Sequence, residues 1–283
     1  MKALTLCFLL ILGLVSCNKI KYVENKQVSF ENTRVLGHRG GGDEGEFLSN
    51  TVLAANDGFD RIDGVEIDVQ ISKDGTVWLA HDVDHTDCSN FSFSCFPDTE
   101  DEVLQSIDSC GTDPFHFSTL EEVFALMSSD YPEKYISIDV KSWFPCDISS
   151  LNVLSKLNDI GDEIIRLTEQ FDLNGHVIVE SEIGAFLTYV RNNSEGIQTH
   201  VLSLGDFDAG VFAVVNGGHH GMSHKFSLDQ NITKEEIEVF KSKGYTVQLW
   251  TVNSQEEIDA AIALEPDFIQ TDNLDFFEDW VGE

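Results

Sequence analysis

Residues 64–69 read Gly-Val-Glu-Ile-Asp-Val, a run in which branched apolar residues alternate with two carboxylates. Such a run predicts a β-strand, and the two-residue period of a strand places Glu66 and Asp68 on one face. Lys73-Asp74-Gly75 then predicts a turn, and residues 76–80 predict a strand that returns beside the first. The segment therefore predicts a strand pair that presents two carboxylates on one side.

Further runs rich in Val, Ile and aromatic residues recur along the chain, with amphipathic stretches between them. Besides residues 64–69, the expected strands of this series cover residues 34–37, 135–140, 176–179, 199–204, 219–222, 246–252 and 267–271. Expected helices include residues 120–127, 151–171, 235–243 and 256–264. Strands that alternate with helices to the end of the chain indicate parallel βαβ units. Eight such units predict a closed (β/α)8 TIM barrel rather than an open sheet.

The segment from about residue 83 to residue 118 fits neither a strand nor a helix pattern. We expect it to be a small insertion after the second strand region, above the barrel mouth. Cys88, Cys95, Cys110 and Cys146 form an even set, which in an oxidising compartment favours two disulfides in one of three pairings. The insertion is therefore expected to be disulfide-stapled. A zinc site is the alternative, although the spacing lacks a Cys-x2-Cys pair.

The chain begins with a short positive start and an apolar run over residues 4–15. A run of this length matches the core of a signal peptide and is too short to span a bilayer. It ends in Leu14-Val15-Ser16-Cys17, which resembles the lipobox of bacterial lipoproteins, where the cysteine becomes the acylated N-terminus. We therefore expect a signal peptide over 1–16, a tether over 17–31 that starts at lipidated Cys17, and a barrel over 32–283. Ordinary signal cleavage, with Cys17 uninvolved, is the alternative.

Charge and the residue after the lipobox indicate where the protein works. Asn18 stands where an aspartate would favour the inner membrane, so we expect an exported protein anchored in the outer membrane, facing the periplasm or the cell surface. The formal net charge of −33, from 50 acidic and 17 basic residues, argues against nucleic acid as a partner. It also repels a phosphodiester unless a bound cation or a few basic groups reverse the local field.

Polar and charged side chains gather at the expected carboxyl ends of strands, where TIM barrels build active sites. The set comprises His38, Arg39, Glu66, Asp68, His81, Asp139 and Lys141. If the strand faces point inward, three carboxylates meet in one cavity and need a cation to stay ionised together. Hard oxygen ligands suit Mg2+ or Ca2+, while two histidines suit a general acid and a general base. Arg39 and Lys141 suit phosphate oxygens.

Several short motifs occur in one order and together resemble the glycerophosphodiester phosphodiesterase family. They are Gly37-His38-Arg39-Gly40, Ser49-Asn50-Thr51, Glu66-Ile67-Asp68-Val69, Lys73-Asp74-Gly75, His81-Asp82, Asp139-Val140-Lys141, Trp250-Thr251-Val252-Asn253 and Thr271-Asp272. Each motif alone is weak, but the ordered set covers nearly all of the chain after the signal segment. The resemblance implies a metal-dependent enzyme that cleaves a glycerol-based phosphodiester to sn-glycerol 3-phosphate and an alcohol.

The resemblance also implies roles for individual residues. The catalytic pair is His38 and His81, the ligands of one divalent cation (Ca2+ or Mg2+) are Glu66, Asp68 and Asp139, and the phosphate contacts are Arg39 and Lys141. Trp250 either stacks on the substrate or packs in the core. Attack by the substrate's neighbouring hydroxyl, which gives a cyclic phosphate, and direct attack by water both remain open.

Two positions depart from the family's pattern. The usual Pro-Glu-Asn-Thr reads Leu48-Ser49-Asn50-Thr51 here, which removes a carboxylate after the first strand. The third metal ligand, usually glutamate, is Asp139, a side chain about one methylene shorter. Neither change removes a catalytic group, so we expect them to affect metal preference and substrate fit.

Other readings remain beside this one. A lysophospholipase D or sphingomyelinase D-like phosphodiesterase would use a related barrel with a wide apolar mouth. A non-catalytic phosphodiester-binding lipoprotein is a further alternative, against which the two retained histidines argue. His219, His220 and His224 form a second cluster that suits either a metal, the substrate rim or a solvated loop. We expect a monomer or weak oligomer that meets the membrane only through its lipid anchor.

Overall fold

The computed structural model describes residues 33–41, 47–81, 95–110, 113–114, 116–142 and 150–276. The expected signal peptide, Cys17 and its tether lie outside the described residues, as do Cys88 and Cys146. Expectations about them stay predictions. In the part of the chain that is described, no helix has both the length and the apolar character needed to cross a bilayer.

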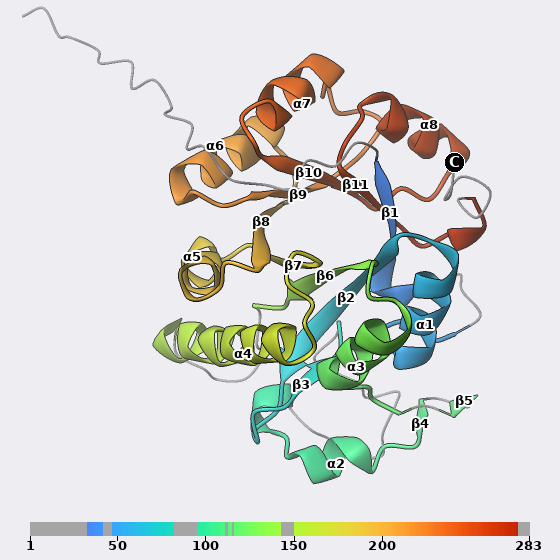
Figure 1. Cartoon of the computed structure of the whole chain (residues 1–283), viewed down its shortest axis with the longest axis vertical. Coiled ribbons are helices and arrows are strands. Elements are labelled where there is room, and N and C mark those ends of the chain that lie inside the picture. Colours follow the sequence, from blue (N-terminus) through green and yellow to red (C-terminus); the bar gives the residue numbers. More distant parts are fainter. Residues whose placement is uncertain are drawn as a thin grey trace, which may run out of the picture.

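Eight parallel strands close into a barrel. In spatial order they are β1 (Arg34–Gly37), β2 (Gly64–Ile71), β6 (Tyr135–Val140), β7 (Val177–Ser181), β8 (Ile197–Ser203), β9 (Gly221–Lys225), β10 (Thr246–Trp250) and β11 (Phe268–Thr271). β1 closes the ring because it pairs with both β2 and β11. Figure 1 places the strands at the centre of the molecule with helices around them. The prediction of a (β/α)8 TIM barrel is therefore confirmed.

Helices connect successive barrel strands and cover the outside of the barrel. They are α1 (Val52–Arg61), α3 (Leu120–Asp130), α4 (Ser150–Gln170), α5 (Gly184–Asn193), α6 (Phe207–Gly217), α7 (Lys234–Lys241) and α8 (Gln255–Ala263). Three of them begin at capping boxes, in which the pairs Thr119 and Glu122, Thr233 and Glu236, and Ser254 and Glu257 exchange hydrogen bonds. These local signals satisfy the free N–H groups at each helix start. The helix starts are therefore fixed by short-range sequence.

Two apolar layers hold the barrel together. The larger lies between the strands and the helices and includes the fully buried Phe59 and Phe124. The smaller consists of Leu36, Ile178 and Phe268. These three come from strands β1, β7 and β11, and β7 is adjacent to neither of the others, so their contact crosses the barrel interior. The barrel is thus plugged by apolar side chains below a polar carboxyl end.

Strand β9 begins at Gly221, two residues later than the sequence predicted. The reason is the end of α6, where Gly218 takes the left-handed conformation (φ 66°) and the His219 N–H still bonds to the Val214 carbonyl. His219 and His220 therefore belong to the connection between helix and strand rather than to the strand itself.

The described part of the predicted insertion packs against the return strand β3 (Val77–Leu79), which pairs antiparallel to β2 as expected. It contains a 3-10 helix (Phe96–Asp98), α2 (Asp101–Gln105) and the short pair β4 (Ser109–Cys110) and β5 (Asp113–Pro114). A separate apolar cluster joins the two parts and includes Trp78, Phe96 and Phe117. Cys95 is buried, and the disulfide pairing of the four cysteines and the stapling of the insertion stay predictions.

Helix α1 packs closely on the segment after β1 at Gly58. A Cβ at this position would lie 2.3 Å from the Gly40 carbonyl oxygen and 2.6 Å from Val65 Cγ1. Alanine gains about 1 kcal/mol over glycine in a free helix, whereas overpacking against a fixed backbone costs about 1–3 kcal/mol or more. We expect Gly58→Ala to lower the free energy of unfolding, and a thermal melt to show a melting temperature lower by a few degrees.

Gly184→Ala in α5 is the control, because the nearest atom to a Cβ there is 3.8 Å away. This variant should melt at or above the wild-type temperature. A Gly58→Ala protein that melts as high as the wild type would contradict the proposed close packing.

Candidate active site

A cavity of about 260 Å3 opens at the carboxyl ends of the barrel strands. Seven of the eight site residues predicted within the barrel line it: His38, Arg39, Glu66, His81, Asp139, Lys141 and Trp250. The eighth, Asp68, lies buried beneath them and contacts both Lys141 and Arg39. The parallel topology thus brings together residues that are spread over most of the sequence. A cavity of this size suits a small molecule.

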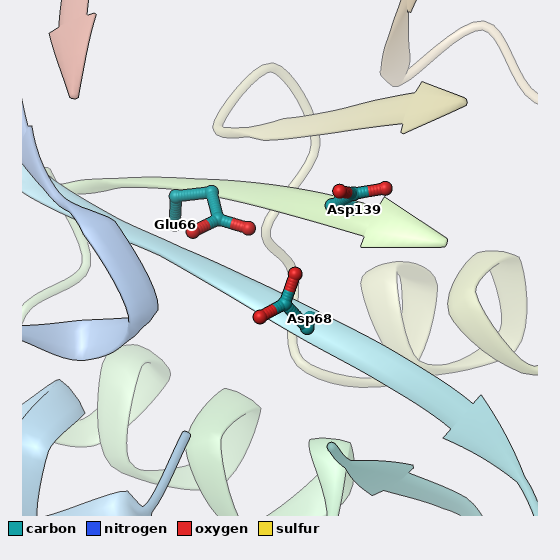
Figure 2. A group of neighbouring side chains, drawn as sticks. All are labelled: Glu66, Asp68 and Asp139. Carbon is teal, nitrogen blue, oxygen red and sulfur yellow. The ribbon is translucent and has the colours of Figure 1, made fainter. Parts of the chain in front are cut away.

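Three carboxylates form the centre of the site. Glu66 and Asp68 project from β2, and Asp139 projects from the neighbouring strand β6, where it is the register partner of Asp68. One oxygen from each of the three lies within 4.8 Å of the others. Figure 2 shows the three side chains on the two adjacent strands. The predicted convergence of these carboxylates is therefore present in the structure.

Two basic side chains contact this group. Lys141 Nζ lies 2.6 Å from Asp139 Oδ2 and 2.7 Å from Asp68 Oδ1, and Arg39 Nε lies 3.2 Å from Asp68 Oδ2. Both residues were predicted as phosphate contacts, and both line the cavity. The same two groups therefore both neutralise the acids and present positive charge to the cavity.

Asn50 is a residue whose place in the site the sequence reasoning missed. Its amide nitrogen donates to Asp68 Oδ2 at 2.8 Å, and its amide oxygen accepts the Asp68 backbone N–H at 2.9 Å. Asn50 adopts a positive φ of 57°, in the left-handed region where asparagine is better tolerated than most residues. The motif Ser49-Asn50-Thr51 was noticed, and its asparagine proves to orient a carboxylate. No carboxylate stands at position 49.

His38 is oriented from behind by Asp272. The His38 Nδ1 lies 2.6 Å from Asp272 Oδ1, and Nε2 lies 3.7 Å from Glu66 Oε2. Asn253 fixes Asp272 in turn, because its amide nitrogen donates to Asp272 Oδ2 and its amide oxygen accepts the Asp272 N–H. A carboxylate on Nδ1 selects the tautomer that leaves Nε2 facing the cavity. The Thr271-Asp272 motif was the sequence signal for this residue, but no role was predicted for it.

The other predicted residues divide into two groups. His81 lines the cavity just beyond β3, and Trp250 at the end of β10 stands in the cavity wall, where it can contact a ligand. The cluster of His219, His220 and His224 does not line this cavity. The His220 Nδ1 accepts the Thr199 N–H, and the His224 Nδ1 lies 3.1 Å from Ser203 Oγ. We therefore see a role for these two rings in supporting β8 and its neighbours.

The electrostatics of the carboxylates fit a bound cation. Burial, then nearby Asp68, Glu180 and Asp139, raises the pKa of Glu66 well above its usual value. Burial also raises the pKa of Asp139 to about 7, against the pull of Lys141. For Asp68 burial acts in the same direction, but Lys141 and the other basic groups hold its pKa below the usual value. Among the described residues, the basic groups thus stabilise the ionised form of Asp68, but they do not compensate for the burial of Glu66 and Asp139.

An oxygen-only donor set with unmatched negative charge fits Mg2+ or Ca2+ better than a softer metal. Glu66, Asp68 and Asp139 are the residues that would hold the ion, since these are the ones whose oxygens converge. Glu180 on β7 also lines the cavity and was not predicted as a site residue.

Comparison with known proteins agrees with this arrangement. Residues 38–276 match the model of the glycerophosphoryl diester phosphodiesterase family. A glycerophosphodiester phosphodiesterase of Bacillus altitudinis is 24% identical over 244 residues, covering 85% of this chain and 94% of the relative.

Two solved structures share the fold. A glycerophosphodiester phosphodiesterase from Thermotoga maritima superposes with a TM-score of 0.67 at 23% identity, covering 88% of this chain and 98% of that one. An Oleispira antarctica phosphodiesterase, solved in complex with sn-glycerol-3-phosphate, superposes with a TM-score of 0.69 at 19% identity, covering 85% and 93% of the two chains.

Asp139 gives a prediction about pH and stability in the metal-free protein. Its pKa is raised in the folded state, so between about pH 4 and pH 7 the folded chain keeps a proton that the unfolded chain has released. The stability from this group is therefore greatest at low pH and is lost as the pH rises toward 7. With EDTA present, the melting temperature of the wild type should fall more between pH 5 and pH 7.5 than that of Asp139→Asn.

Saturating Mg2+ or Ca2+ should remove this extra fall, because a bound cation stabilises the ionised carboxylate. Thermal melts at several pH values, with EDTA or with the cation, measure the effect. Equal pH slopes for wild type and Asp139→Asn in EDTA would show that Asp139 is ionised without a cation.

Proposed function

Because the chain belongs to the glycerophosphoryl diester phosphodiesterase family, we propose that it hydrolyses glycerophosphodiesters to sn-glycerol 3-phosphate and an alcohol. One observation carries the proposal for this particular chain. Three carboxylates converge at the barrel mouth beside a histidine that a fourth acid, Asp272, holds in place. The product bound to the Oleispira antarctica relative supports the same class of small-molecule substrate.

Glu66, Asp68 and Asp139 would hold one divalent cation, Ca2+ or Mg2+. When bound, such a cation draws charge from a phosphoryl oxygen and offsets the repulsion between substrate and carboxylates. Arg39 and Lys141 contact the carboxylates and also line the cavity. They would orient the remaining phosphoryl oxygens by charge-assisted hydrogen bonds.

His38 and His81 would move the protons. The reaction needs a base that takes a proton from the attacking hydroxyl and an acid that gives one to the departing alkoxide. Asp272 on Nδ1 leaves the His38 Nε2 free of that contact and directed toward the cavity, which suits either task. His81 stands in the cavity wall as the second proton carrier. The same pair serves attack by water or by the neighbouring hydroxyl of the substrate.

An acylated substrate, such as a lysophospholipid, is a second candidate. Leu202 and Leu204 from the end of β8 line the cavity, and Leu204 is 54% exposed. An exposed leucine beside a polar site favours contact with an apolar group of the substrate. Glycerophosphocholine and lysophosphatidylcholine, offered separately, distinguish the two substrate classes.

We expect the soluble fragment 18–283 to release glycerol 3-phosphate from glycerophosphocholine, as read by a coupled assay. EDTA should abolish release, and added Ca2+ or Mg2+ should restore it. His38→Ala and His81→Ala should each lower kcat by about 10²–10⁴-fold, the range for loss of a general acid or base.

His220→Ala is the matched control, because its ring lies in the barrel wall outside the cavity. This variant should keep most of the activity. Release that persists in EDTA, or in both cavity histidine variants, would contradict the proposed chemistry. Turnover of the lysolipid alone would move the proposal to the second substrate class.

The anchored location belongs to the same proposal. Cleavage before Cys17 and acylation of this residue would hold the barrel by a tether over 17–31, at the outer membrane, with the catalytic domain over 32–283. A stapled insertion would suit this oxidising compartment. The chain would act there as a monomer or weak oligomer on substrate from deacylated phospholipid.

Expression of the full chain in a Gram-negative host tests the anchor. The wild type should pellet with the membranes. Cys17→Ser should move to the soluble fraction, because the substitution removes the residue that carries the acyl chains, and stable anchoring needs two or more of them. Cys7→Ser, within the signal segment, is the control and should still pellet. A Cys17→Ser protein that stays in the membrane fraction would contradict the lipid anchor.

A further inference from the structure

Glu180 lies inside the barrel on β7 and is 1% exposed. Its Oε1 accepts three hydrogen bonds, from Ser137 Oγ at 2.5 Å, Gln248 Nε2 at 2.7 Å and Gln270 Nε2 at 2.8 Å. The donors come from β6, β10 and β11, so the contacts reach across the barrel interior. Hydrogen bonds from three strands hold this buried carboxylate in a fixed position.

The position of Glu180 relates it directly to the carboxylate group. Glu180 is the register partner of Asp139 on the adjacent parallel strand, and both side chains line the cavity. Neighbouring strands lie about 4.8 Å apart, so the two acids are close enough to interact strongly. The negative charge of Glu180 also raises the pKa of Glu66. Glu180 is therefore a further carboxylate of the site, beside the three whose oxygens converge.

Lys141 and Arg39 form their ion pairs with other carboxylates, although the charge of Lys141 also acts on Glu180. Lys141 bonds to Asp68 and Asp139, and Arg39 pairs with Asp68. Among the described residues, no basic side chain forms an ion pair with Glu180, whose partners are a hydroxyl and two amides. With His38 and Asp272 set aside as a pair, Lys141 and Arg39 are the basic groups beside Glu66, Asp68, Asp139 and Glu180, and Glu182 is a further carboxylate in the cavity lining. The carboxylates of the site therefore outnumber its basic groups, which favours a bound cation.

We propose that Glu180 is a positioning residue for the divalent cation, a further carboxylate that strengthens cation binding from its place beside Asp139. The inference rests on the proposed function, since it concerns the same cation. Glu180 acts through its charge and through its fixed place beside Asp139. This role differs from that of a polar residue that only supports the fold. Removing the charge of Glu180 should weaken cation binding, whereas a purely structural residue would not affect it through charge.

Glu180→Gln tests this role, because glutamine has nearly the same shape and its amide oxygen can accept the same donors. Isothermal titration of the metal-free protein with Ca2+, Mg2+ or Mn2+, without substrate, gives the dissociation constant directly. We expect it to rise by about 10–100-fold, as for other groups that support metal ligands from behind. At saturating cation, kcat should return to within about threefold of wild type, because Glu180 does not take part in the proton transfers.

Asp267→Asn is the matched control. Asp267 is another buried carboxylate, but it accepts the Val247 N–H and pairs with Lys241 beside the amino end of β11, away from the cavity. The same acid-to-amide change there should leave the cation affinity unchanged. If Glu180→Gln does not fold by circular dichroism, Glu180→Asp replaces it, with the charge kept but drawn back from Asp139. It should weaken cation binding by a smaller factor.

The outcomes separate this inference from the proposed function. A wild-type protein that binds no divalent cation removes the proposed function, and this inference with it. A wild type that binds a cation, with unchanged affinity in a folded Glu180 variant, overturns only the role of Glu180. A weakened affinity in Glu180→Gln together with an unchanged one in Asp267→Asn supports it.

Discussion

Buried carboxylates that repel one another occupy the carboxyl end of this barrel, and their repulsion constrains the groups around them. Lys141 bridges Asp68 and Asp139, and Asn50 binds Asp68 through two hydrogen bonds. Even so, the pKa of Asp139 stays near 7, because burial disfavours the ionised form. A divalent cation would relieve this strain and create the positive centre that a phosphodiester needs. The demand is sharper on a chain with a net charge of −33.

Closure of the barrel brings His38 and Asp272 together. His38 follows β1 and Asp272 follows β11, so the two residues are 234 positions apart in sequence. β1 pairs with β11 in parallel register, which brings Gly37 level with Thr271 and sets the next residues side by side. The hydrogen bond between His38 and Asp272 therefore depends on the last strand pairing of the fold. A change that loosens this pairing would affect the orientation of the histidine.

Sequence alone predicted what depends on local patterns. The alternation in residues 64–69 placed Glu66 and Asp68 on one face, and the structure confirms their convergence with Asp139. Glu180, Asp272 and Asn50 were missed as site residues, because their importance depends on register and contacts between distant strands. A glutamate in the run Val177–Ser181 looks like any polar interruption until the register with β6 is known. His219, His220 and His224, for which a metal, the substrate rim and a solvated loop were left open, do not line the cavity.

The proposed mechanism depends on a single divalent cation held by the converging carboxylates. The most direct test is the stoichiometry of Mn2+ bound to the metal-free protein, measured by electron paramagnetic resonance of the free ion, for wild type, Glu66→Gln and Asp68→Asn. We expect one tight site per wild-type chain, and its loss in both variants. A wild type without a tight site, or variants that keep it, would show that these carboxylates do not hold the cation.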